Sequence, residues 1–140
     1  MDMVLQGNKF FQKIGRWRMN NIYCLDQKMI DLARRALKCK HWTIHPPEAS
    51  RQLPKRNQRG MLWVRESQPW GDWLPDFGDD ATLGCLQALV RKAWGCAYLT
   101  AVGDADKEWR IDAENIPGVR DLHSFRSEAE ALVAALEAAP

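Results

Sequence analysis

Residues 76–95, DFGDDATLGCLQALVRKAWG, constrain the fold most, because they contain a helix together with the signals for both of its ends. Asp79 or Asp80 can accept hydrogen bonds from the exposed amides of a first helical turn. Gly95 can end the helix in the left-handed conformation. The stretch therefore predicts a helix from Asp80 to Trp94 with one buried face. That face contains Leu83, Leu86, Val90 and Ala93.

Around this helix the sequence predicts two further helices, three strands and a short fourth strand at Leu122–Phe125. Asp26 is a suitable cap for a helix from Gln27 to about Cys39. Ser127 and Glu130 match a capping box that opens a helix reaching Ala138. The three strands are predicted at Met61–Arg65, Cys96–Val102 and Trp109–Ala113, and the last two form a hairpin. This order predicts an α+β fold in which a small sheet, containing an antiparallel hairpin, packs against two or three helices.

The length of 140 residues fits one domain. We expect a basic N-terminal extension at residues 1–25 and a single α+β domain at 26–140, with a Pro-rich and basic loop at 45–60. No apolar run is long enough to cross a bilayer, so no membrane partner is expected. The four cysteines are scattered, which is typical of a protein in a reducing cytoplasm.

The charges are distributed unevenly along the chain. Residues 1–65 contain 14 Lys and Arg against 4 Asp and Glu, and residues 66–140 contain 6 against 14, which together give the net charge of +2. Either the basic half binds an anion such as nucleic acid, or the two halves fold against each other and partly cancel. The residues proposed for nucleic acid are Arg51, Lys55, Arg56 and Arg59. The Asp80 helix itself is unsuited to reading DNA, because its first positions are acidic or small.

Aromatic residues gather between positions 63 and 77. Tryptophan buries a large area with few rotatable bonds, which suits it to anchoring a protein partner. Two interpretations remain open, since the same residues could instead extend a small core. The partner-binding set proposed is Trp70, Trp73, Phe77 and Asp72.

Signals for chemistry are weak. Cys39, His41 and His45 have zinc-ligand types, but no fourth ligand is near and Pro46 breaks the segment. The cations around Cys39 could lower the pKa of its thiol, yet no signature of a cysteine enzyme surrounds it. No nucleotide-binding motif is present. We expect no catalytic residue, no metal and no cofactor, and rank an enzyme behind a binding module.

Three segments carry a family resemblance: LARRAL, the DDATLGCLQALVRKAWG stretch, and EAEALVAALEAAP at the end. They resemble a group of small proteins of phages and prophages, and the element order is similar to phage helix–sheet–helix sandwich domains. The resemblance covers about Asp26 to Pro140 and brings no catalytic residues with it. It implies a phage accessory protein in the host cytoplasm that binds a host protein, such as a defence complex of the CRISPR kind.

Overall fold

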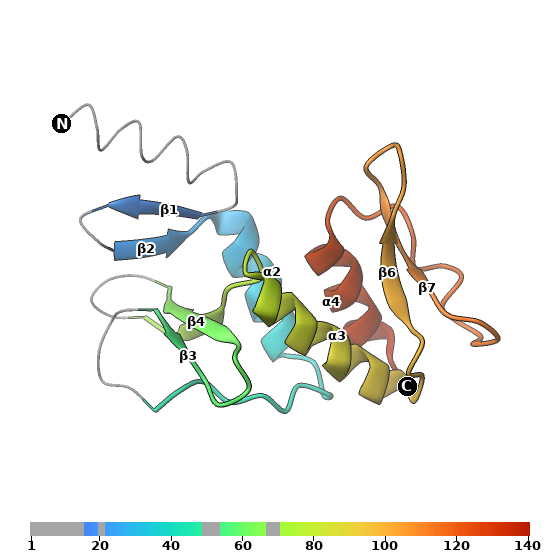
Figure 1. Ribbon diagram of the computed structural model, residues 1–140, viewed down its shortest axis with the longest axis horizontal. Helices are drawn as coiled ribbons and strands as arrows, with labels where there is room; N and C mark the ends of the chain where they lie inside the picture. The colour runs from blue at the N-terminus through green and yellow to red at the C-terminus, as the bar shows by residue number, and fades with distance from the viewer. Residues whose placement is uncertain (1–15, 20–21, 49–53, 67–70) are drawn as a thin grey trace. The chain divides into compact units, whose positions relative to one another are not determined.

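A computed structural model describes residues 16–19, 22–48, 54–66 and 71–140, and describes side chains from Leu25 onward. Its described part has three helices and small antiparallel sheets, which confirms the α+β class (Figure 1). The described residues form two compact units. Unit 1 contains those up to Arg34 and those from Ile44 to Thr82, and unit 2 contains 35–43 and 83–140.

Unit 1 is built on short antiparallel strands. A hairpin pairs β1 (Arg16–Met19) with β2 (Ile22–Leu25), and a three-stranded sheet has the order β3 (Lys55–Arg56), β4 (Leu62–Arg65) and β5 (Trp73–Pro75). The part of α2 (Gln27–Leu37) up to Arg34 belongs to the same unit. The largest fully buried side chains here are Met61, Trp63, Leu74 and Phe77.

Unit 2 contains most of α3 (Asp80–Trp94), the hairpin of β6 (Thr100–Gly103) and β7 (Trp109–Asp112), and α4 (Glu128–Ala138). Helix α4 packs on both strands of the hairpin. The indole of Trp94 donates a 2.8 Å hydrogen bond to the Ala135 carbonyl and so joins α3 to α4. Four of the predicted core positions, Leu86, Val90, Leu132 and Leu136, are confirmed, since at most 1% of each is exposed. Leu83 and Ala93 of the predicted buried face are only half-buried.

All three helix starts agree with the sequence prediction. The Asp26 carboxylate accepts from the Met29 amide at 2.9 Å at the start of α2. The Asp79 carboxylate accepts from the Thr82 amide at 3.1 Å and so caps α3. The Ser127 hydroxyl accepts from the Glu130 amide at 3.1 Å and caps α4. Gly95 follows α3 with a φ of 66°, as its proposed role requires.

The other half of the predicted capping box is different in the structure. The Glu130 carboxylate accepts from the amide of Arg126, at 3.4 Å, rather than from that of Ser127. Such a length marks a weak hydrogen bond. The cap of α4 therefore depends mainly on the Ser127 hydroxyl.

Several boundaries in the sequence prediction are wrong. The strand predicted from Cys96 begins only at Thr100, because residues 96–99 first form a turn in which the Leu99 amide donates to the Cys96 carbonyl. Helix α2 ends at Leu37, since the Cys39 amide closes a tighter turn on Ala36. Four strands were not predicted. They are the β1–β2 hairpin in the expected extension, β3 in the expected loop, and β5.

Candidate functional site

The partner-binding set lies at the β4–β5 edge of unit 1. Trp73 of β5 is in register with Arg65 of β4, and the Arg65 guanidinium lies over the Trp73 ring at 4.3 Å from its centre. Arg65 Nη1 also donates to the Gly71 carbonyl at 3.0 Å, and the Glu66 amide donates to the Asp72 carbonyl at 2.9 Å. These contacts hold the half-buried Trp73 ring and the exposed Asp72 in fixed positions at this edge.

The remaining two members of the set are not available there. Trp70 lies outside the described residues. Phe77 is only 2% exposed and forms part of the core, so in this structure it has no surface to offer a partner. Of the set, Trp73 and Asp72 thus lie at this edge, next to Arg65. No local sequence signal pointed to Arg65, because its position over Trp73 depends on the register of β4 with β5.

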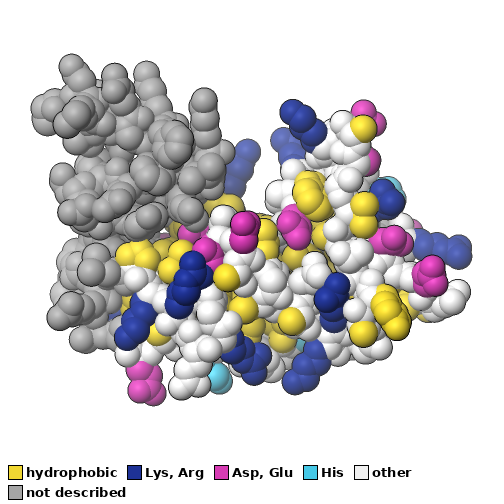
Figure 2. Space-filling model, in the orientation of Figure 1, with side chains coloured by type: hydrophobic (Ala, Val, Ile, Leu, Met, Phe, Trp, Pro, Cys, Tyr) yellow, Lys and Arg dark blue, Asp and Glu magenta, His cyan; other side chains and the backbone are white. Residues whose placement is uncertain are grey.

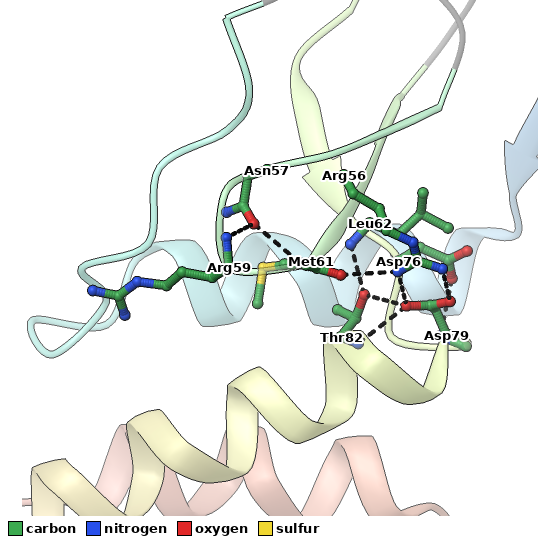
Figure 3. A network of polar contacts seen from close by, with 10 residues as sticks. Arg56, Asn57, Arg59, Met61, Leu62, Asp76, Asp79 and Thr82 are labelled. Carbon is green, nitrogen blue, oxygen red and sulfur yellow. Dashed lines mark hydrogen bonds and ion pairs between the residues drawn. The ribbon is translucent and has the colours of Figure 1, made fainter.

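A second polar network joins the β3–β4 hairpin to the start of α3 (Figure 3). Arg56 makes a two-pronged ion pair with Asp79, with both nitrogen–oxygen distances at 2.8 Å. The Thr82 hydroxyl donates to the Asp79 carboxylate at 2.9 Å and accepts from the Leu62 amide at 2.9 Å. The Asp76 amide adds a bond to the Leu62 carbonyl. The network fixes the residues that begin α3, up to Thr82, against the sheet of unit 1.

The ion pair also changes the acidity of Asp79. The hydrogen bonds from Arg56, with help from Thr82, lower the pKa of the Asp79 carboxyl from 3.8 to about 2, against the opposing effect of burial. The Asp79 side chain is only 14% exposed. A carboxylate that is held this way stays ionised at every physiological pH.

This network bears directly on the nucleic-acid set. Arg56 is engaged by Asp79, and Arg51 lies outside the described residues. Lys55 and Arg59 are exposed, and Figure 3 shows the Arg59 side chain pointing away from Arg56. The described part of the set therefore does not form one basic patch.

The ion pairs agree with the interpretation that the basic and acidic halves of the sequence partly cancel each other's charge. Each ion pair found among the described residues joins a cation from positions 1–65 to a carboxylate from positions 66–140. The pairs are Arg34–Glu66, Arg35–Glu137 and Arg56–Asp79. In unit 2, Figure 2 shows Lys and Arg side chains interspersed with Asp and Glu on the visible face. The two halves of the sequence thus partly neutralise each other.

Cys39 and His41 lie near Glu137 and Pro140. Burial raises the pKa of the Cys39 thiol, with a further contribution from Glu137, and these effects outweigh the lowering by the nearby Arg35 cation. The cations around Cys39 therefore do not lower the pKa of its thiol overall. His41 Nε2 lies 2.7 Å from the carbonyl oxygen of Pro140. Across the described ranges, no three His, Cys, Asp or Glu side chains gather as a metal site would need.

Unit 2 has one surface hollow that the sequence did not predict. It measures about 400 Å³ and is lined by Ala113, Asn115, Ile116, Pro117 and Arg120. A single exposed cation on a mostly apolar wall defines no particular ligand.

None of the helices in the described part of the chain is both long and apolar enough to cross a bilayer. Comparison of the chain with protein-family models, curated proteins and solved structures returned no match. The resemblance to phage proteins therefore remains a prediction.

Proposed function

We propose that the chain is a non-enzymatic binding module that recognises a protein partner through Trp73, Asp72 and Arg65. The observation that carries the proposal is the half-exposed Trp73 ring held by the Arg65 guanidinium. An aromatic anchor fixed before binding loses little side-chain entropy when a partner covers it. Tryptophan and arginine are also the residue types that dominate the binding energy of protein interfaces.

The resemblance to phage and prophage proteins supports a more specific form of this proposal. The partner would be a host protein met in the host cytoplasm, such as a defence complex of the CRISPR kind. The exposed Asp72 would favour a basic surface on that partner.

The test is capture of partners from bacterial lysate on the full chain, followed by titration of the captured protein. We expect Trp73→Ala to weaken binding at least tenfold, or about 1.4 kcal/mol, and Trp73→Phe to retain part of it. Tyr98→Ala is the matched control, since Tyr98 is an aromatic with 87% of its surface exposed in the other unit. Equal binding by Trp73→Ala and the unchanged chain would remove the proposal.

Nucleic acid is the alternative partner, supported by the exposed Lys55 and Arg59. It is the weaker proposal because Arg56 is already paired with Asp79. Phosphate binding would weaken steeply as salt rises, since each contact releases counterions. Replacing Lys55 and Arg59 with Ser should then reduce both the affinity and its dependence on salt. Nuclease treatment of the lysate separates this alternative from a direct protein contact.

A further inference from the structure

The β6–β7 hairpin has two edges, and the hydrogen bonds show which residues point to each. The amides of Trp109 and Ile111 on β7 donate to the carbonyls of Phe125 at 2.7 Å and Leu122 at 2.8 Å, away from β6. The backbone groups of successive residues in a strand point to opposite edges. The amides and carbonyls of Arg110 and Asp112 must therefore point toward β6.

The register carries this alternation onto β6. Val102 pairs with Arg110, and Thr100 pairs with Asp112. The backbone amides and carbonyls of Val102 and Thr100 therefore point toward β7. The 2.9 Å bond from the Asp104 amide to the Glu108 carbonyl continues the same pattern at the turn. It follows that Ala101 and Gly103 direct their amides and carbonyls toward the outer edge of β6.

This outer edge is open. Among the described residues, no backbone group bonds to the outward amides or carbonyls of Ala101 and Gly103. The Thr100 hydroxyl reaches the Ala101 carbonyl only at 3.5 Å, the limit of a hydrogen bond. By contrast, the outer edge of β7 is covered by the bonds to residues 122–125.

The edges of the sheet in unit 1 carry features that discourage pairing, and β6 does not. Strand β3 consists of two cations, Lys55 and Arg56, and β5 ends in Pro75. Charged side chains and proline are the usual protection of an edge strand. Strand β6 reads TAVG and contains neither. An unprotected edge of neutral, small residues is a template for another strand.

We propose that β6 pairs antiparallel with β6 of a second copy of this chain, with Val102 on the two-fold axis. In this register Ala101 of each copy lies opposite Gly103 of the other. Each such pair exchanges two hydrogen bonds, so all the open groups of both edges are satisfied by four bonds. The two Val102 side chains lie directly opposite each other, which is a favourable pair for β-branched residues.

Charges at the two ends of β6 favour a second copy over an unrelated peptide. At the beginning of the strand, Arg91 Nε donates to the Leu99 carbonyl at 2.8 Å. At the other end, the exposed Asp104 and Asp106 form the turn into β7. Antiparallel pairing places the acidic turn of each copy beside the Arg91 end of the other, and it sets no like charges opposite each other along TAVG.

The proposal is tested on the full chain by sedimentation equilibrium over a range of concentrations. We expect Val102→Glu to raise the dimer dissociation constant at least about tenfold, because two carboxylates would then face each other across the axis. The same side chain lies opposite Arg110 within its own hairpin, so the melting temperature of the monomer should be kept. Val102→Thr is the matched control and should leave the dimer within about threefold of its original strength.

Two further experiments keep the result decisive. The double variant Val102→Lys with Arg110→Glu places a cation at position 102 and keeps an opposite charge at its hairpin partner, position 110. Mixing this variant with Val102→Glu should restore dimers, because the lysine of one copy then faces the carboxylate of the other. Ala101→Pro removes the outward amide that makes two of the four bonds, while no bond of the hairpin is lost. A chain that is monomeric at every soluble concentration overturns the proposal. So does a dimer that Val102→Glu and Ala101→Pro leave unchanged.

Discussion

Helix α3 is capped by Asp79, whose carboxylate is held by Arg56 from 23 residues earlier in the chain, whereas α4 is capped by Ser127 and is supported by its own first turn. Both caps satisfy an amide that the helix leaves without a partner. The cap of α3 also ties the first turn of the helix to a sheet, through Thr82 and Leu62. A cap of the same local form can thus stabilise either one helix or a whole tertiary connection.

The largest difference between the two caps should appear on removing Asp79. Asp79→Ala loses the helix cap and the ion pair together, and it leaves Arg56 without its carboxylate partner. We expect the free energy of unfolding to fall by about 2–3 kcal/mol in urea titrations. Asp80→Ala, at the exposed neighbouring position, should change it by less than about 0.5 kcal/mol. Equal losses in the two variants would contradict the assigned cap.

The second largest difference should appear at low pH, where the stabilisation by Asp79 is lost. The pKa of Asp79 lies at about 2 in the folded chain against 3.8 ordinarily, so its stabilisation is complete above about pH 4 and is lost as the pH falls through 2. Asp79→Asn keeps a capping oxygen but cannot ionise. Its deficit against the unchanged chain, measured in urea at pH 5, 3 and 2, should shrink by up to about 2 kcal/mol. A deficit that is constant with pH would show that the ion pair contributes nothing.

Removing the cap of α4 should cost less. Ser127→Ala loses one hydrogen bond and should lower the free energy of unfolding by about 1 kcal/mol. Ser127→Asp keeps an acceptor for the Glu130 amide and should restore most of it. Urea titration of both variants at pH 5 and 7 is the measurement. If Ser127→Ala lowered the free energy of unfolding as much as Asp79→Ala does, the two caps would contribute equally to stability.

The smallest effect is expected at Glu130. Its carboxylate accepts only the 3.4 Å bond from the Arg126 amide. Glu130→Gln keeps an acceptor and should change the free energy of unfolding by less than about 0.5 kcal/mol. A loss near 1 kcal/mol would indicate a complete capping box in solution.

The same contrast explains what could be predicted from the sequence. Asp79, Gly95 and Ser127 act on residues within one turn, so their roles were predicted correctly. The buried stripe of Leu86 and Val90 follows from helical periodicity and is confirmed. Local signals and regular spacing therefore account for the helices and for the α+β class.

Features that depend on strand pairing were not predicted. Strand β5 was hidden by the turn-forming residues around Trp73, and Phe77 was assigned to a surface although it lies in the core. The Arg65–Trp73 contact and the Arg56–Asp79 pair each need the register of one strand against another element. No local pattern encodes that register, so the candidate site was only partly predictable.

The course of the chain through the two units has a consequence for synthesis on the ribosome. Residues 35–43 belong to unit 2, yet the partners of Arg35 and His41 are Glu137 and Pro140, about a hundred residues later. The segment is made long before those partners exist, while everything described in unit 1 has been translated by Thr82. Unit 1 can therefore begin to fold on the nascent chain, but unit 2 is completed only when α4 has emerged.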